Sequence, residues 1–192
     1  MRTLRAIEFM SLDGVIQAPG SPEEDTEGGF RHGGWQREYG DDILGAAAEG
    51  MASTDAYLFG RRTYEGMAAY WPTVSDEDPY ARHLNATPKY VASRTLRSLD
   101  WQGSTLIEGD VGDAVAELKR RAGGNIAILG SARLVRSLLA RDLVDELWLV
   151  VFPILLGSGK RLFGERDRPA RLSLVASKPT STGGVMLTYR RA

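Results

Sequence analysis

Apolar positions along the chain follow two alternating patterns. In one, short and mostly apolar runs stand between turn-forming residues, which is typical of β-strands. In the other, apolar residues recur every three or four positions, which is typical of helices with one buried face. These patterns predict strands at residues 3–10, 55–59, 89–93, 104–108, 125–129, 144–153, 172–176 and 185–190.

Helices are predicted in four of the segments between these strands. The first begins at Asp41, and the second spans Arg61–Tyr70. The third follows Asp110, whose side chain suits a helix N-cap, and the fourth follows Gly130-Ser131. This order predicts a three-layer α/β fold over residues 1–192, as one domain with a mostly parallel central sheet, helices on both faces and a final antiparallel pair of strands.

Two segments stand out from this alternation. Residues 17–34 are polar and contain several glycines and prolines, and a loop of that length in a small domain is usually functional or disordered. Residues 147–156 form the longest apolar run, which is far shorter than the roughly 20 residues of a membrane span. We therefore expect a soluble protein. Core burial explains the run best, and packing across the two-fold axis of a homodimer is the alternative.

The composition narrows the chemistry. Lys and Arg total 24 against 25 Asp and Glu, so a net charge of -1 gives no general attraction to nucleic acid or anionic lipid. Any anion site must therefore be local. The chain has no cysteine, which excludes disulfides, thiolate zinc sites and cysteine nucleophiles. The first residues hold too short an apolar stretch for a signal peptide, and we expect a cytoplasmic protein.

Three turns follow strand ends and enter, or nearly enter, a helix. They are Gly60-Arg61-Arg62-Thr63, Ser93-Arg94-Thr95 and Gly130-Ser131-Ala132. A helix N-terminus at the carboxyl end of a strand presents free N–H groups and a positive dipole to a phosphate, and arginine adds a planar fork. Singly, each turn is explained as well by a solvated arginine or an ordinary cap. Together the three turns suit a ligand with several phosphates, such as a dinucleotide.

Other catalytic motifs are missing. No G-x-G-x-x-G follows a strand, and residues 157–160 lack the first glycine and the final hydroxyl residue of a phosphate-binding P-loop. His32 and His83 have no partner at metal-ligand spacing, so we expect ordinary surface histidines and no metal site. Asp41 and Asp42 are the candidates for acid–base catalysis, although carboxylates at a helix N-terminus also simply complement its dipole.

Taken together, these turns resemble the dihydrofolate reductase superfamily. The resemblance is closer to the branch shared with the reductase half of the bifunctional riboflavin-biosynthesis deaminase–reductase. The matching pieces occur in the family's order and span nearly the whole chain. They are residues 11–16 (SLDGVI), 58–65 (LFGRRTYE), 91–94 (VASR), 128–135 (ILGSARLV), 143–147 (LVDEL) and 153–157 (PILLG).

The resemblance implies a binding site for NADPH. The Arg61 turn would hold the adenosine-side phosphates, and Ser93 with Arg94 would reach the ribose 2′-phosphate. The Gly130 turn would bind the pyrophosphate. The implied cofactor-binding residues are Ile16, Gln17, Gly60, Arg61, Arg62, Thr63, Ser93, Arg94, Leu129, Gly130, Ser131, Ala132 and Leu134.

On the nicotinamide side, the resemblance places Ile16, Gln17 and Leu129. The family often has a cis peptide between two glycines at the third turn. The second glycine is replaced here by Ser131, and a cis bond between Gly130 and Ser131 is a hypothesis that the structure can test.

The chain departs from the family on the substrate side. Trp35 matches a tryptophan that dihydrofolate reductases place in the first long loop, and the resemblance makes it the expected substrate-contacting residue. Asp41 or Asp42 lies near the position of the family's carboxylate without matching its spacing. Small residues at 46–48 replace an aromatic expected to face a pterin. Thr87-Pro88 stands where an arginine would clamp the folate tail, so folate is not the expected substrate.

These features lead to two functional hypotheses. The first is an NADPH-dependent oxidoreductase that reduces a small heterocyclic or carbonyl compound. Residues 17–34 would close over the nicotinamide, and the proton would come from Asp41, Asp42 or bound water. The alternative is a non-catalytic NADP-binding protein that has lost its substrate site. A purely structural dimer domain is a third hypothesis.

Overall fold

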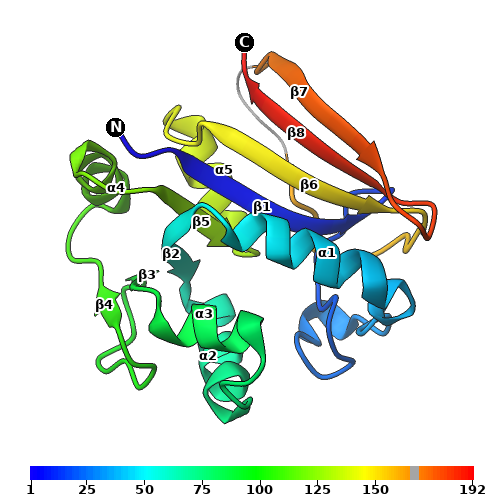
Figure 1. The fold of residues 1–192 in the computed structure, drawn as a ribbon, viewed down its shortest axis with the longest axis horizontal. Helices are drawn as coiled ribbons and strands as arrows, with labels where there is room; N and C mark the ends of the chain where they lie inside the picture. Colours follow the sequence, from blue (N-terminus) through cyan, green and yellow to red (C-terminus); the bar gives the residue numbers. More distant parts are fainter. Residues whose placement is uncertain (165–168) are drawn as a thin grey trace.

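Eight strands form one twisted sheet in the computed structural model, which describes residues 1–164 and 169–192 (Figure 1). The side chains of Asp41, Asp42, Leu44 and Ala47 lie outside this description. The strand order is β4-β3-β2-β5-β1-β6-β8-β7. The strands are β1 (Leu4–Ser11), β2 (Thr54–Gly60), β3 (Lys89–Ala92), β4 (Ser104–Leu106), β5 (Asn125–Leu129), β6 (Glu146–Phe152), β7 (Leu172–Pro179) and β8 (Val185–Arg191).

The strand directions confirm the predicted sheet. Strands β4, β3, β2, β5, β1 and β6 are parallel, while β8 runs antiparallel to β6 and β7 runs antiparallel to β8. The carboxyl ends of the parallel strands therefore meet along one edge of the sheet, where open α/β sheets bind ligands.

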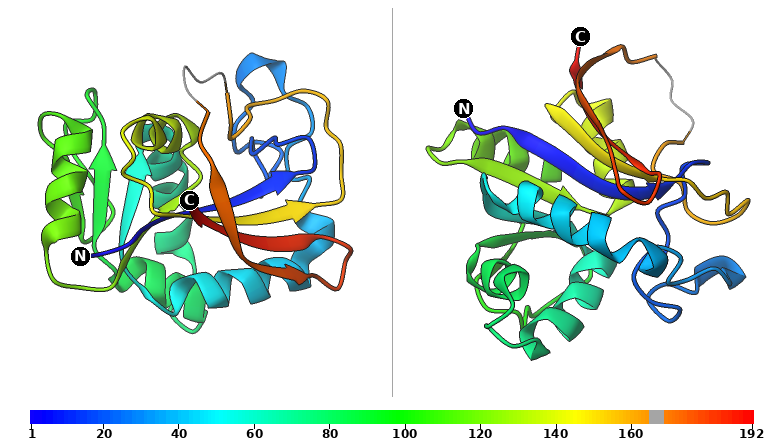
Figure 2. Two further views of the ribbon diagram at one scale, coloured as in Figure 1. Left: turned by 90° about the horizontal axis from the view of Figure 1, so that it is seen from above. Right: turned by 45° about the vertical axis from the view of Figure 1, so that its right-hand side comes forward.

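Helices cover both faces of the sheet, as the alternation predicts (Figure 2). Side chains of α1 (Gly40–Met51), α2 (Arg61–Tyr70) and α3 (Pro79–Ala86) join one hydrophobic cluster, and those of α4 (Val111–Arg120) and α5 (Ala132–Ala140) join the other. Alternate residues of the central strands belong to alternate clusters, because successive side chains of a strand point to opposite faces. None of the helices in the described residues is long and apolar enough to cross a membrane.

Local capping accounts for the helix boundaries. The carboxylate of Asp110 accepts a hydrogen bond from the N–H of Asp113 at 2.9 Å, which confirms the predicted cap of α4. Helix α3 was not predicted. Its start is marked by Asp78, which accepts from the N–H groups of Tyr80 and Ala81 at 2.8 and 2.9 Å. The dipeptide Asp78-Pro79 is the sequence signal that the hydrophobic pattern missed, because this helix has only two turns.

Strand β6 is buried along its whole length, as its continuous apolar pattern indicates. It lies between β1 and β8, and both of its edges are hydrogen-bonded within the chain. Core burial therefore explains the part of this run that lies in β6. Neither edge of β6 is free to pair with a second copy, whereas Leu155, at the end of the run, is 71% exposed. The homodimer stays a prediction.

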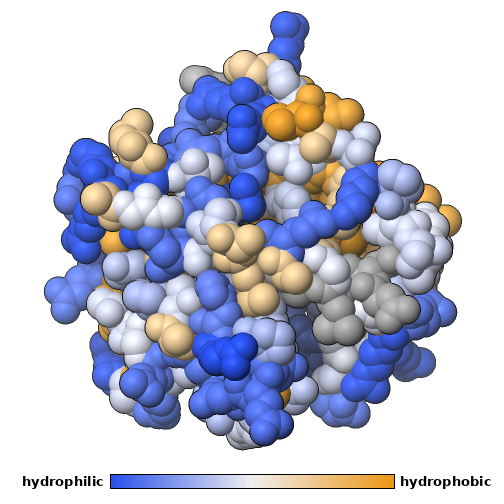
Figure 3. All heavy atoms as spheres, in the orientation of Figure 1, coloured by the Kyte–Doolittle hydropathy of each residue, from blue (hydrophilic) through white to orange (hydrophobic). Residues whose placement is uncertain are grey.

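The open edge of the sheet is β7. All eight of its residues are exposed, and Leu172, Leu174 and Val175 keep 41%, 54% and 48% of their surface accessible. Figure 3 shows apolar side chains gathered near the top of the molecule, over β7 and β8.

A buried lysine anchors the other end of the sheet. Lys89 begins β3 and is 0% exposed, and its ammonium donates to the carbonyls of Asn85, Thr87 and Gln102 at 3.0, 2.8 and 3.0 Å. The same ammonium lies 4.5 Å from the ring centroid of Trp101. Burial lowers the pKa of Lys89 to about 8, so the group stays protonated at neutral pH and uses all three donors.

Candidate functional site

Two of the three predicted turns lie side by side at the carboxyl edge of the sheet. The Gly60 turn ends β2 and the Gly130 turn ends β5, and these strands are neighbours. The hydroxyl of Ser131 accepts from the N–H of Gly60 at 3.0 Å and donates to the carbonyl of Leu129 at 3.2 Å. This side chain fixes the spacing between the two turns.

The Gly130-Ser131 turn is built from left-handed backbone rather than from a cis peptide. Gly130 has φ +54° and Ser131 has φ +61°, and the peptide between them is trans. The hypothesis of a cis bond is therefore wrong. Two successive left-handed residues already reverse the chain between β5 and α5. A Cβ on Gly130 would lie 3.5 Å from the side chain of Thr63, so the turn packs closely against α2.

Each of these turns leads into a helix whose first N–H groups have no acceptor within the helix. Ser131 does not cap α5 with its side chain, since its hydroxyl is engaged by Gly60 and Leu129. Helix α2 likewise starts without a side-chain cap. Two helix N-termini therefore present donors and positive dipoles to the same region, which is suited to an anion.

Arginines flank this region. Arg61 pairs with Glu65 of its own helix at 3.1 Å, and Arg62 pairs with Glu27 from the long loop. Their side chains are 42% and 52% exposed, so both guanidinium groups remain accessible to a ligand. The predicted positions of Arg61 and Arg62 beside the Gly130 turn therefore agree with a local anion site in a chain without net positive charge.

The third turn follows β3, which pairs with β2 so that Ala92 stands opposite Gly60. The three turns thus end three consecutive strands of the sheet. The expectation that Ser93 nearly enters a helix is wrong, because residues 93–103 are irregular and lead to β4. Instead, the Ser93 hydroxyl accepts from the N–H groups of Thr95 and Leu96 at 3.2 and 3.0 Å. Arg94 is exposed and has no ion pair among the described residues.

Residues 16 and 17, which follow β1, are hydrogen-bonded to Lys160 in the segment after β6. The Ile16 N–H donates to the carbonyl of Lys160 at 2.9 Å. The Gln17 side chain is 3% exposed and accepts from the Lys160 N–H at 2.9 Å, while its amide donates to the carbonyls of Asp25 and Glu27, both at 3.0 Å. Gln17 therefore shapes the long loop from inside, and its predicted contact with a nicotinamide stays a prediction.

Ion pairs join this loop to its surroundings. Glu27 pairs with Arg62 of α2 and with Lys160, the latter at 2.5 Å, and Lys160 also pairs with Asp25. We call these four residues the loop latch. The latch connects the loop directly to one of the arginines predicted to hold a phosphate.

The glycine-rich residues 157–160 have a packing role. Gly159 has φ +116°, and a Cβ at this position would lie 2.7 Å from both Phe30 and Val15. Only glycine fits there, so the resemblance to a phosphate-binding loop reflects close packing against the long loop.

Trp35 is buried under the same loop. It is 7% exposed, its indole N–H donates to the carbonyl of Gln17 at 2.9 Å, and its ring meets Phe152 edge-on at 5.7 Å. These contacts hold the loop to the sheet. The predicted contact of Trp35 with a substrate remains a prediction.

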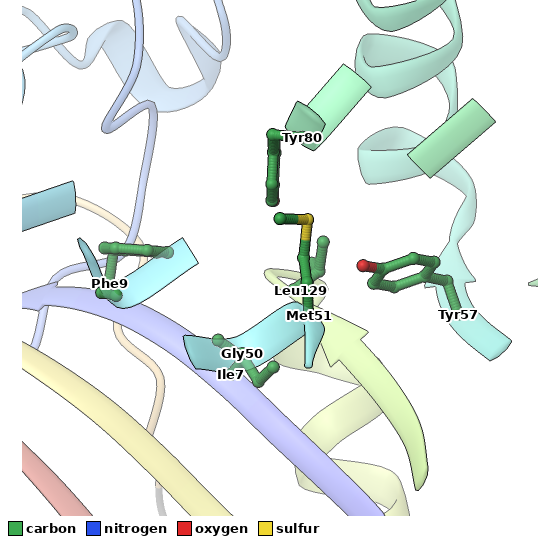
Figure 4. Close-up of a pocket in the computed structure, with 8 residues that line it drawn as sticks. Ile7, Phe9, Gly50, Met51, Tyr57, Tyr80 and Leu129 are labelled. Carbon is green, nitrogen blue, oxygen red and sulfur yellow. The ribbon is translucent and has the colours of Figure 1, made fainter. Parts of the chain in front are cut away.

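A pocket of about 240 Å³, including space open to solvent, lies between α1, α3 and the strands β1, β2 and β5 (Figure 4). Leu129, which immediately precedes the Gly130 turn, forms part of its wall, so the pocket adjoins the anion site. The lining residues are Ile7, Phe9, Ala46, Gly50, Met51, Tyr57, Tyr80 and Leu129.

Two tyrosines in this pocket were missed by the sequence analysis. Burial raises the pKa of Tyr57 well above its ordinary value, and the neighbouring Tyr80 phenol raises it further. Burial also raises the pKa of Tyr80. His83 meets the Tyr57 ring edge-on at 5.8 Å, and burial followed by the charge of Lys89 lowers its pKa. The expectation of a surface histidine is therefore wrong for His83, whereas His32 is exposed.

The predicted catalytic carboxylates belong to the first turn of α1. The side chains of Asp41 and Asp42 lie outside the described residues, so their role stays a prediction. No cluster of three or more potential metal ligands occurs among the residues that the structure describes.

Comparison with known proteins agrees with this architecture. A family model described as the RibD C-terminal domain matches residues 2–186. The chain belongs to this family. It is 31% identical to the uncharacterized protein YyaP of Bacillus subtilis (strain 168) over 138 residues, which cover 70% of this chain and 73% of YyaP. It is 29% identical to the uncharacterized protein YwjB of the same organism over 184 residues, covering 95% and 94% of the two chains.

Solved structures show the same fold. A putative riboflavin biosynthesis protein from Shewanella sp. PV-4 aligns with a TM-score of 0.70 at 24% identity, covering 100% of this chain and 99% of that one. Dihydrofolate reductase from Enterococcus faecalis, in complex with NADP(H) and RAB-propyl, aligns with a TM-score of 0.59 at 18% identity over 98% and 96%. The RibD C-terminal family and the dihydrofolate reductase-like fold, both expected from the sequence, are thus confirmed.

Proposed function

We propose that this protein is an NADPH-dependent oxidoreductase that reduces a small heterocyclic or carbonyl compound. The observation that carries the proposal is the junction of the Gly60 and Gly130 turns through the Ser131 hydroxyl. It sets two uncapped helix N-termini beside a pocket whose wall includes Leu129. An anion site next to a small apolar pocket is the arrangement that a phosphate-bearing cofactor and a small substrate require.

The residues of the site suit NADPH. The N–H groups at the starts of α2 and α5 would bind the phosphates, with Arg61 and Arg62 supplying positive charge. Arg94, exposed and unpaired among the described residues, would bind the ribose 2′-phosphate. When bound, the cofactor supplies a hydride. The pocket would hold the substrate beside Leu129, exclude water and orient the reducible bond. Asp41, Asp42 or a bound water would supply the proton.

The cofactor preference provides a direct test. In a fluorescence titration with NADPH and NADH, Arg94→Ala should raise the Kd for NADPH by about 10-fold or more and leave the Kd for NADH unchanged. This follows because a hydrogen bond to a charged group contributes about 1.5–3 kcal/mol. The same titration of Arg61→Ala should weaken both cofactors less selectively. Arg97→Ala, which removes another exposed arginine of the same loop, is the matched control. Equal losses for both cofactors in Arg94→Ala would refute the 2′-phosphate assignment.

A non-catalytic NADP-binding protein is the second candidate function. It is favoured by one observation, namely that no carboxylate lines the pocket among the described side chains. Tight NADPH binding without oxidation across a panel of pterins, pyrimidines and aldehydes would support this alternative. Oxidation of NADPH with any member of the panel would eliminate it.

A further inference from the structure

The wall of the pocket combines apolar surface with two phenols. Six of its eight lining residues are apolar or glycine, and Tyr57 and Tyr80 are the other two. No ionised side chain lines the pocket among the described residues. Tyr57 comes from the middle of β2 and Tyr80 from the first turn of α3, so the two phenols reach the pocket from different elements.

The Tyr57 hydroxyl is oriented for a ligand. Tyr57 is 2% exposed, and its ring is held between Phe59, stacked at 5.9 Å, and His83, edge-on at 5.8 Å. Figure 4 shows its hydroxyl pointing away from β2, toward Met51 and Leu129. This hydroxyl has no hydrogen-bond partner among the described residues. The hydroxyl oxygen still touches solvent at the pocket, so an acceptor on a ligand would take the place of a water there.

The same wall discriminates against charged groups. An ionised carboxylate or phosphate that entered the pocket would lose its hydration without meeting an opposite charge on the described lining residues. The phenols also stay neutral at physiological pH, because burial raises the pKa of both. They therefore offer hydrogen bonds rather than ionic contacts.

The size of the pocket limits the occupant as well. Its 240 Å³ includes space open to solvent, so an occupant would lie at the mouth of the pocket and only a single small ring would face the lining residues. Because Leu129 belongs to both the pocket and the strand that ends at the Gly130 turn, such a ring would lie next to the proposed cofactor site.

We infer that Tyr57 and Tyr80 recognise the substrate, and that the substrate presents an uncharged small ring whose carbonyl or ring-nitrogen acceptor receives a hydrogen bond from the Tyr57 hydroxyl. Any charged part of the substrate stays outside the pocket. That this ligand is a substrate rests on the proposed reductase function, whereas recognition of an uncharged ring by the pocket is independent of it.

A matched pair of probes tests the inference without any turnover. The probe 2-pyridone is flat, uncharged and carries a carbonyl acceptor, and 6-hydroxynicotinate adds a carboxylate to the same ring. Binding is measured by NMR titration for the wild-type protein and for Tyr57→Phe, Tyr80→Phe and Tyr90→Phe. Phenylalanine keeps the ring packing, so thermal unfolding is expected to change little. Tyr90 is a half-buried tyrosine of β3 whose side chain packs on the opposite face of the sheet, which makes it the control.

We expect wild-type protein to bind 2-pyridone at least 10-fold more tightly than 6-hydroxynicotinate. Tyr57→Phe should weaken 2-pyridone binding about 2- to 13-fold, the range that corresponds to one neutral hydrogen bond. Tyr80→Phe should also weaken it, and Tyr90→Phe should leave it unchanged. Absence of 2-pyridone binding to the wild type, tighter binding of the carboxylate, or an equal effect of Tyr90→Phe would overturn the inference.

Titration of the same proteins with NADPH separates this inference from the proposed function. One outcome would be normal NADPH binding by the wild type and by Tyr57→Phe, with the same affinity of both proteins for 2-pyridone. That outcome would refute the inference about the pocket and leave the proposed function standing. Conversely, 2-pyridone binding that depends on Tyr57 in a protein that does not bind NADPH would refute the proposed reductase and leave the pocket assignment intact.

Discussion

The loop latch makes a specific prediction about cofactor affinity. The Glu27 carboxylate forms ion pairs with Lys160 and with Arg62. Arg62 is one of the two arginines proposed to hold a cofactor phosphate. A phosphate that approaches Arg62 must therefore compete with this carboxylate and is also repelled by it. Replacing Glu27 by glutamine keeps the size of the side chain and removes the competing charge, so Glu27→Gln should bind NADPH more tightly.

The magnitude follows from exposure. The side chains of Arg62 and Glu27 are 52% and 42% exposed, which places the pair among surface ion pairs of about 0.2–1 kcal/mol. Releasing Arg62 from such a pair corresponds to a decrease of about 1.4- to 5-fold in the Kd for NADPH. Because exposed charges are screened by salt, the gain should shrink as ionic strength rises.

The assay is a fluorescence titration with NADPH at low and at high salt. Glu117→Gln is the matched control, since Glu117 forms an exposed pair with Arg120 on α4, away from the site. Weaker NADPH binding by Glu27→Gln would refute the competition and show that the latch orders the loop for binding. An equal gain in NADPH affinity for Glu117→Gln would show that the effect comes only from the change in net charge.

Three further predictions concern stability and the joined turns. Ser131→Ala removes the acceptor of the Gly60 N–H. It should lower the free energy of unfolding in urea by about 1–2 kcal/mol and should also weaken NADPH binding. An unchanged unfolding free energy and an unchanged Kd for NADPH would contradict the coupling of the two turns. Lys89→Met leaves three carbonyls without their buried donor and should cost about 3 kcal/mol by the same measurement, whereas Lys178→Met on exposed β7 should cost under about 0.5 kcal/mol. The hydrogen bond from the Ser11 hydroxyl, joined by the N–H groups of Leu156 and Gly157, lowers the pKa of Asp13 from 3.8 to about 2. The folded pKa lies below the unfolded one, so this stabilisation of about 1–2 kcal/mol is complete above pH 3.8 and is lost as the pH falls through about 2. The stability difference between wild type and Asp13→Asn should narrow over that interval, and a constant difference would contradict the assignment.

Much of the fold follows from short-range patterns. Strand β5 and helix α2 begin and end at the predicted residues, and β6 is buried on both faces as its apolar run indicates. These elements were predictable because their hydrophobic periods are strong and their ends carry turn or capping residues. Helix α3 was missed because two turns give too little periodicity, and only Asp78-Pro79 marks its start.

The positions of the three turns were predictable for a related reason, whereas their binding of a cofactor stays a prediction. Each turn is a continuous stretch of a few residues at the end of a strand, and glycine and arginine in such a stretch favour an anion. What sequence patterns left open was how the turns meet. The Ser131 hydroxyl, at a residue predicted only to bind cofactor, accepts a hydrogen bond from the N–H of Gly60, across a separation that no local pattern describes.

The sequence by itself determined the order of the elements, the class of fold and the positions of the turns at the strand ends, because these depend on neighbouring residues along the chain. The tertiary structure decided the loop latch and the pocket. Glu27 meets Arg62, and Tyr57 shares a wall with Gly50, Tyr80 and Leu129, only after the sheet has brought separate segments together. Such contacts depend on strand order and helix packing, and the residues that make them look like ordinary loop or core residues until those are known.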